Sequence, residues 1–270
     1  MIEVNIIVHN PPSSGANLSE NTEKSILCYA AFVEANINSV KPFSEFRKEV
    51  SAQTGTNIKN DRTIYPMFKY LGLISYDKLE ELNYSHFFTP TGIAYVKFLQ
   101  IKWQMQNAYN NNPNDKNLYI SIKKVERLIN EVIFHGLQHL FQSYDNNTVS
   151  YRGWLIILIK FLLKFNSINK DEFAYLVYFC EQKKQDVHEL EEVIKEYRRG
   201  EIKFSVIVDA YDKTKGATVR KRAKITNLTA FGYQMSLLAG AGIVSEKEDR
   251  RFYLNEDSRQ KTISIVTQAE

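Results

Sequence analysis

Six basic residues stand close together in the last quarter of the chain, and no acidic residue follows them until Glu246. Lysine neutralises phosphates, arginine can pair bidentately with guanine and asparagine with adenine, so Asn227 belongs with this group. The chemistry that fits these residue types is contact with DNA. A charge cluster is also typical of an ordinary solvated helix face, and that alternative stays open. The basic residues are Lys213, Lys215, Arg220, Lys221, Arg222 and Lys224.

A second set of candidates lies in the first third of the chain, in the segment NIKNDRTIYPMFKYLGL. It offers Lys59, Asn60, Arg62 and Lys69 on or near an expected helix. Pro66 complicates this helix, because a proline beyond the first turn removes a backbone hydrogen bond and kinks it. An ordinary capped helix with a polar outer face explains these residues as well as a DNA-reading role does.

Glu131, His135 and His139 are spaced so that they stack along one side of a helix and could begin a zinc site. The pattern lacks the Glu directly after the first His that makes HExxH specific, and no fourth ligand is evident. We therefore predict no metal site and interpret the three residues as an exposed polar stripe.

Metal-dependent cleavage of phosphodiesters would require an Asp or Glu, then any residue, then Lys. The nearest match to this motif is Glu201, Ile202 and Lys203. We expect its neighbours to be helical and Asp186 to cap a helix, so we predict no catalytic residue. The chain also lacks a GxSxG elbow, a GxxxxGK phosphate loop and a dinucleotide fingerprint.

The composition predicts a globular intracellular protein. The chain has 270 residues, 44% of them hydrophobic, which is enough for two or three small domains. Its formal charge of +4 identifies no partner. Cys28 and Cys180 stand alone, which fits a reducing compartment. The N-terminus lacks a secretory signal and the longest apolar run, Trp154–Phe165, is short and contains lysines, so we expect cytoplasmic location and no membrane contact.

The first 110 residues read as three helices followed by two short strands. Gly72 stops the third helix, and the strand-like segments LISY and HFFTP follow it. This order predicts an N-terminal winged-helix DNA-binding domain over residues 1–110, with the third helix reading the groove. We expect the helices over residues 23–35, 44–53 and 60–71, an extended arm before them, and a long helix over 92–108 after the strands.

The polar tract Asn110–Asn117 marks a boundary, and a helical core is expected over residues 118–200. Residues 201–270 then repeat the first pattern, with a helix capped by Thr218 whose inward stripe runs from Ile225 to Leu238, and a hairpin over 243–254. Arg250 and Arg251 in that hairpin would add positive charge beside the helix. The predicted fold is thus mainly α with short β-hairpins, as two winged-helix units with a helical core between them.

The order of these features resembles the DNA-recognition half of type IIS restriction and nicking endonucleases of the AlwI and PleI kind. The likeness covers nearly the whole chain, through IIVHNPP, DRTIYPMFKYLGLI with FFTPTGIAYVKFL, WLIILIKFLLKFNSINKDEFAYLVYFCEQKKQDVHELEEVIKEYRR and AKITNLTAFGYQMSLLAGAGIVSEKEDRRFYLN. The resemblance implies winged-helix subdomains around duplex DNA and a separate magnesium-dependent nuclease domain of the PD-(D/E)xK type. No such motif is credible here, so we expect no catalysis by this chain alone and no cofactor in it.

The resemblance makes double-stranded DNA the expected partner, with a nuclease domain or subunit as a second one. It places the groove-reading elements at residues 62–69 and 220–227. The expected function is sequence-specific DNA binding, as the recognition module of a type IIS-like restriction system. A plasmid replication initiator or transcription regulator with tandem winged helices is the alternative, and it would favour palindromic sites.

Overall fold

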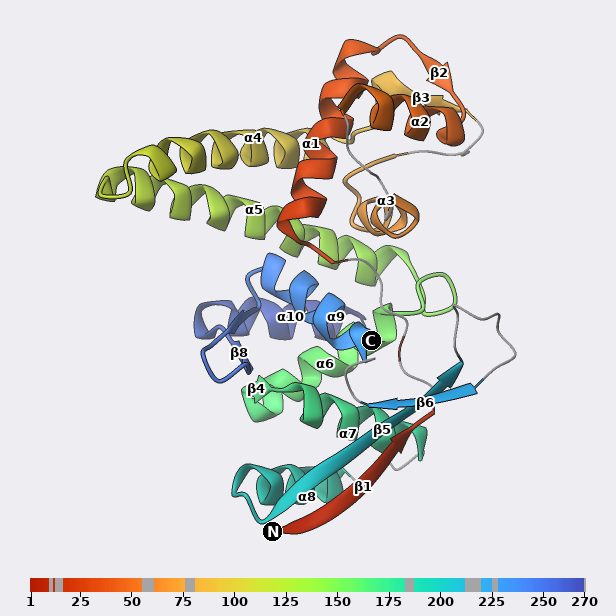
Figure 1. Ribbon diagram of the computed structural model, residues 1–270, viewed down its shortest axis with the longest axis vertical. Coiled ribbons are helices and arrows are strands. Elements are labelled where there is room, and N and C mark those ends of the chain that lie inside the picture. Colours follow the sequence, from red (N-terminus) through yellow and green to blue (C-terminus); the bar gives the residue numbers. More distant parts are fainter. Residues whose placement is uncertain are drawn as a thin grey trace.

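The chain is mostly helical and has three small β-sheets in its computed structural model (Figure 1). The structure describes residues 1–9, 12, 17–54, 61–75, 81–182, 187–211, 220–224 and 228–269. The prediction of a mainly α fold with short β-strands is confirmed. Across the described residues, no helix has the length and apolar character needed to span a membrane.

The first group of elements, here called the N-terminal unit, contains three helices and short antiparallel strand pairs. β2 pairs with β3, and Ile74 forms a single antiparallel bridge with Phe88 in place of the longer predicted hairpin. Buried aromatic rings from all three helices fill its core. The elements are α1 (Glu20–Ala35), β2 (Val40–Lys41), α2 (Phe43–Thr54), α3 (Asp61–Tyr70), β3 (Leu82–Asn83) and a 3₁₀ turn, Tyr84–His86.

Two long helices, α4 (Pro90–Asn111) and α5 (Lys116–Ser143), form an antiparallel hairpin that projects from the body of the protein (Figure 1). The side chains of Thr89 and Asp115 cap their first turns by accepting backbone N–H hydrogen bonds. α5 contacts α3, and it also contacts two helices of the C-terminal unit described below, α9 (Thr229–Gly240) and α10 (Arg259–Ala269). The predicted boundary at the polar tract Asn110–Asn117 is therefore the tip of this hairpin.

The C-terminal unit follows the same order of elements as the N-terminal unit. Its strands form a three-stranded antiparallel sheet with the order β4-β8-β7, which corresponds to β2, β3 and the Ile74 bridge. Rings of Phe173 in α7 and Phe231 in α9 meet at 5.3 Å and join these helices. Besides α9 and α10, its elements are α6 (Arg152–Phe165), β4 (Ser167–Ile168), α7 (Lys170–Glu181), β7 (Val244–Glu246), β8 (Phe252–Leu254) and a 3₁₀ turn, Glu256–Ser258.

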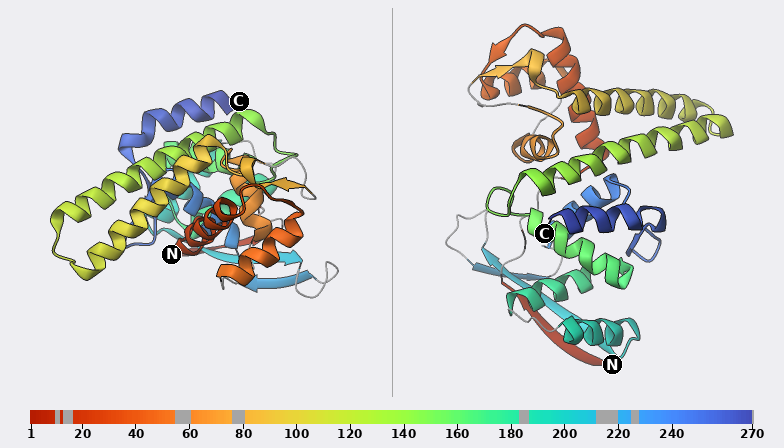
Figure 2. Two further views of the ribbon diagram at one scale, coloured as in Figure 1. Left: turned by 90° about the horizontal axis from the view of Figure 1, so that it is seen from above. Right: turned by 180° about the vertical axis from the view of Figure 1, so that it is seen from behind.

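An insertion separates α7 from α9 in the C-terminal unit. It consists of α8 (Val187–Arg198), β5 (Ile202–Tyr211) and β6 (Arg220–Lys224). β5 pairs antiparallel with β6 and parallel with β1 (Ile2–Val8), so the sheet order is β1-β5-β6. The expected N-terminal arm is thus a strand that belongs with the last third of the chain. α7 and α8 lie on one face of this sheet (Figures 1 and 2).

A matching turn ends the third helix of each unit. Gly72 and Gly242 have positive φ values of 66° and 68°, which glycine adopts without steric cost. The N–H of the residue after each glycine donates to the carbonyl five residues earlier, from Leu73 to Phe68 and from Ile243 to Leu238, both at 2.9 Å. These bonds satisfy carbonyls at the ends of the two helices, and in both units the backbone continues into an extended segment.

The same correspondence continues where each strand pair ends. Thr89 Oγ1 donates to the carbonyl of Gly72 at 2.7 Å, and Asn255 Nδ2 donates to that of Gly242 at 2.9 Å. Two elements of unrelated sequence therefore repeat one backbone path down to single hydrogen bonds.

Candidate nucleic-acid interface

α3 carries two of the four candidates from the first third of the chain. Arg62 lies in its first turn and Lys69 in its last, whereas Lys59 and Asn60 fall outside the described residues. Pro66 lies within the helix without ending it, although it has no N–H to donate to the carbonyl of residue 62. α3 is anchored in the core by the buried side chains of Ile64, Tyr65, Met67 and Phe68.

Lys69 lines a cavity of about 370 Å³ between α3, the first turn of α4 and α5. His135 and His139 of α5 line the same cavity. Tyr70, next to Lys69, packs its ring edge-on against Tyr144 at 5.0 Å, which holds the end of α3 on the segment after α5. The last turn of α3 is thus fixed from two sides.

The three candidate metal ligands each have a partner in the structure. Glu131 pairs with Lys261 at 2.6 Å. Nδ1 of His135 lies 2.8 Å from Oε1 of Gln138, and Nδ1 of His139 lies 3.2 Å from Oγ of Ser143. No cluster of three metal-binding side chains occurs in the part of the chain that the structure describes. The three residues lie along one helix, as their spacing predicts.

The second basic segment is a strand, which corrects the predicted helix from Thr218 to Leu238. Residues Arg220, Lys221, Arg222 and Lys224 lie on β6, paired with β5. The apolar stripe that suggested a helix belongs to α9, which begins only at Thr229. Extending its period back over the basic residues was wrong, because backbone pairing with β5 decides their conformation. Asn227, the last candidate of this group, lies outside the described residues.

One face of the β1-β5-β6 sheet is covered. The ring of Phe204 in β5 stacks on those of Tyr175 and Tyr197, with centroids 5.0 and 4.5 Å apart. Burial raises the pKa of each tyrosine to about 12. Val208 on the same face is 2% exposed. This face is packed against α7 and α8.

The opposite face, here called the outer face, is not covered by α7 and α8. Lys203 and Ile207 lie on it, with the Lys203 side chain 54% and Ile207 39% exposed. The strand register puts position 224 across from Ile207 and position 222 across from Asp209, so 220, 222 and 224 form a row on the outer face. The structure therefore gathers three basic positions of β6 on one side of the sheet.

Acidic groups offset part of this charge. Asp209 is buried, and its Oδ2 lies 3.6 Å from Nδ1 of His9. Lys203 lies 3.5 Å from a carboxylate oxygen of Glu3 on β1. Both of these contacts join β5 to β1 or to His9, the residue that follows β1.

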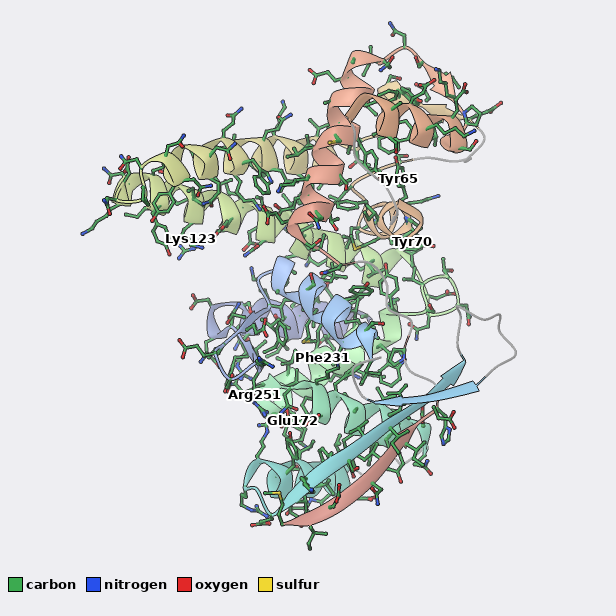
Figure 3. All side chains as sticks on the ribbon, in the orientation of Figure 1. Tyr65, Tyr70, Lys123, Glu172, Phe231 and Arg251 are labelled. Carbon is green, nitrogen blue, oxygen red and sulfur yellow. The ribbon has the colours of Figure 1, made fainter. Side chains whose placement is uncertain are left out.

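The two arginines of the predicted hairpin have different surroundings. Arg251 donates to both carboxylate oxygens of Glu172 at 2.6 and 2.7 Å, and Arg198 donates to the same carboxylate at 2.8 Å (Figure 3). Glu172 is fully buried, so this pairing binds β8, α7 and α8 together. Arg250 is exposed at the turn before β8. Of the two, Arg250 has the geometry for an external contact.

The nearest match to a nuclease motif lies between α8 and β5, so its neighbours are helical on the preceding side, as expected, but form a strand on the following side. Glu201 pairs with Arg199 at 2.6 Å, next to the pairing of Lys203 with Glu3. Asp186 lies outside the described residues.

Sequence reasoning missed the outer face. The segment IKFSVIV alternates covered and open positions with a period of two, which is the pattern of a strand with one face exposed. That period puts Lys203 on the same face as Ile207, and it is the signal by which this surface could have been found.

Comparison with protein-family models, curated proteins and solved structures found no match to this chain. The arrangement of its elements and charges is therefore the basis for a functional interpretation.

Proposed function

We propose that this chain is a sequence-specific module for binding double-stranded DNA, built from two winged-helix units. The observation that carries the proposal is the repeat. Apart from the α8–β6 insertion, each unit runs through a helix, a short strand and two more helices, then a matched glycine turn and an antiparallel pairing, which in the N-terminal unit is a single bridge. That order supports a winged-helix reading, in which the third helix would enter the major groove.

In the N-terminal unit, α3 is the groove-reading helix of this proposal. Arg62 lies in its first turn, and Lys59 and Asn60 precede it in sequence. Arginine and asparagine are the side chains best suited to reading guanine and adenine. Lys69, at the opposite end, supplies a phosphate contact.

In the C-terminal unit, α9 has no charged residue in the sequence TAFGYQMSLLAG. The positive charge of this unit precedes α9, on β6, and Arg250 adds to it from the turn before β8. Arg251 is bound to Glu172, so the proposal does not rely on it.

The restriction context follows from the sequence resemblance alone. In the restriction reading, this chain would bind DNA and position a separate nuclease domain or subunit that uses magnesium. This chain itself would not catalyse cleavage. The regulator reading shares the DNA-binding part and differs in the symmetry of its site.

Selection of bound duplexes from a random pool tests the proposal. We expect one enriched asymmetric site, and a binding constant that falls steeply with salt because phosphate contacts displace ions. A palindrome would support the regulator reading, and no retention of duplex at low salt would refute DNA binding.

An Arg62→Ala variant sharpens the same experiment. If Arg62 reads a base, its loss should relax the selected sequence at one position at a cost of about 1–3 kcal/mol there. Lys123→Ala is the matched control, since Lys123 lies on the α4–α5 hairpin, away from α3 (Figure 3). An unchanged selection in the Arg62 variant would remove α3 from the reading surface.

A further inference from the structure

A groove of about 290 Å³ lies in the N-terminal unit between α1, the 3₁₀ turn and the first half of α4. Its inner lining is apolar and includes Val33 and Val96, which are 5% and 7% exposed. Ile37, just after α1, and Ile93 on α4 also line it but remain 45% and 46% exposed. None of its described lining residues belongs to α3, so the groove is separate from the proposed DNA-reading helix.

The matching space in the C-terminal unit is closed by that unit's own side chains. Arg259 corresponds to Ile93, because each follows the residue that bonds to the glycine turn by four positions. Arg259 donates to the carbonyl of Leu163 at 3.2 Å and to Oδ1 of Asn166 at 3.1 Å. Its side chain therefore bridges α10 and the end of α6, whereas an isoleucine at position 93 makes no such bridge.

A charged position beside the groove differs in the same way. Glu34 in α1 and Lys164 in α6 both lie two residues before the residue that caps the helix C-terminus. Lys164 pairs with Glu191 of α8 at 2.8 Å, but only six residues separate α2 from α3, too few for a counterpart of α8. Among the described residues, neither Glu34 nor Lys97, which lines the groove on α4, forms an ion pair.

The exposed side of α4 extends the groove into a longer surface. Ile93, Lys97 and Ile101 follow one another at intervals of four and therefore share one side of the helix. Ile101 is 39% exposed. Single exposed apolar residues are ordinary, but apolar residues that line one groove and its continuation are typical of an interaction surface.

This surface is complementary to itself. Two copies related by a two-fold axis use the same patch twice, so that a contact made in one direction is also made in the other. If the axis passes beside Lys97 and the two α4 helices are antiparallel, Ile93 of each copy meets Ile101 of the other. Lys97 of each copy then lies near Glu34 of the other, which gives both charges the opposite partner that they lack within one copy.

We infer that the groove between α1 and α4, with its continuation along α4, is a self-association surface through which two copies of this chain bind each other. The inference is independent of the proposed DNA binding, because α3 is not part of this surface and association is measured without DNA. Where both hold, one particle carries two DNA-binding modules.

Sedimentation equilibrium over a range of protein concentrations tests the inference. We expect a reversible equilibrium between monomer and dimer, and Ile93→Glu should weaken it by at least about tenfold because a charge enters an apolar contact. Ile263→Glu is the matched control, since Ile263 is 40% exposed on α10, the helix that corresponds to α4, and lies outside the groove. A parent that stays monomeric, or equal association of the two variants, overturns the inference.

Charge exchange tests the pairing itself and guards against a folding artefact. Glu34→Lys and Lys97→Glu each place like charges opposite one another in the dimer, so each should weaken association. The double variant exchanges the two charges and should restore the dimer, a recovery that a folding defect does not explain. If the double variant associates no better than the single variants, the two copies do not meet through this surface and the inference is wrong.

Discussion

The N-terminal and C-terminal units follow one backbone path but connect their second and third helices differently. In the N-terminal unit α2 ends at Thr54 and α3 begins at Asp61. In the C-terminal unit the same connection runs from Glu181 to Thr229 and holds α8, β5 and β6. Surface connections accept such insertions because lengthening a loop costs little free energy. The comparison shows that the connection can change greatly while the unit around it is preserved.

The placement of charge differs in the same way. α3 contains Arg62 and Lys69 within the helix itself, whereas α9 contains no charge and the basic residues stand on the inserted strand before it. Under the proposed function, the first unit would contact DNA through α3 itself and the second through the inserted strand that precedes α9. The insertion would then be the element that lets an uncharged third helix belong to a DNA-binding unit.

The largest predicted difference between the units concerns the third residue of the second helix. Glu172 in α7 is fully buried and holds Arg198 and Arg251, whereas Glu45 at the matching position of α2 is exposed. Glu172→Ala leaves two cations without their buried partner and should lower the free energy of unfolding by about 3–5 kcal/mol.

Glu45→Ala is the matched control and should change stability by less than about 0.5 kcal/mol. Urea unfolding followed by circular dichroism measures both variants. Similar losses at Glu172 and Glu45 would mean that the buried pairing adds nothing specific to the C-terminal unit.

A second difference concerns the position three residues after the matched residues Thr89 and Asn255. A Cβ on Gly92 would overlap the carbonyl oxygen of Leu73, whereas the C-terminal unit has Ser258 there, whose Oγ donates to the equivalent carbonyl of Ile243. Gly92→Ser should therefore cost about 2–3 kcal/mol through overpacking. Ser258→Gly should cost about 1 kcal/mol through lost hydrogen bonds.

Thermal unfolding of the two variants checks this order. If Gly92→Ser were the milder change, the close approach of α4 to the turn at Gly72 and Leu73 would not constrain position 92, and the correspondence between the two units would fail at this point.

Much of the fold could be predicted from local patterns. The three N-terminal helices were predicted within a few residues, because stops such as Gly72 act over one turn. The pairing of β1 with β5 could not be predicted, since it joins Ile2 to Ile202 and leaves no local signal. The insertion in the C-terminal unit was hidden for the same reason.

The candidate site was predicted in composition but not in form. Sequence reasoning found the basic residues of β6 and extended a helical period over them from α9, because residue types alone do not reveal a partner strand. It also grouped Arg251 with Arg250, although Arg251 is bound to a buried carboxylate. From the sequence alone, a charged residue in a hairpin can be assigned equally well to ligand binding or to an internal ion pair.

The smallest predicted effect is a pH dependence confined to the insertion. Glu191 of α8 accepts hydrogen bonds from Lys164 of α6 at 2.8 Å and from Lys195 at 3.0 Å, and these lower its pKa from 4.5 to about 2. A carboxyl whose pKa is lower in the folded state stabilises the fold above its unfolded pKa and loses that contribution as pH falls. Glu191→Gln should therefore lose less stability than the parent between pH 5 and pH 3, by a small amount because the pair is partly exposed and screened by salt.

Lys164→Gln should reproduce most of this change, since the bond from Lys164 is the main cause of the lowered pKa of Glu191. Urea midpoints at the two pH values measure it, and equal pH sensitivity in parent and variants would show that α8 is not fastened to the C-terminal unit through this pair.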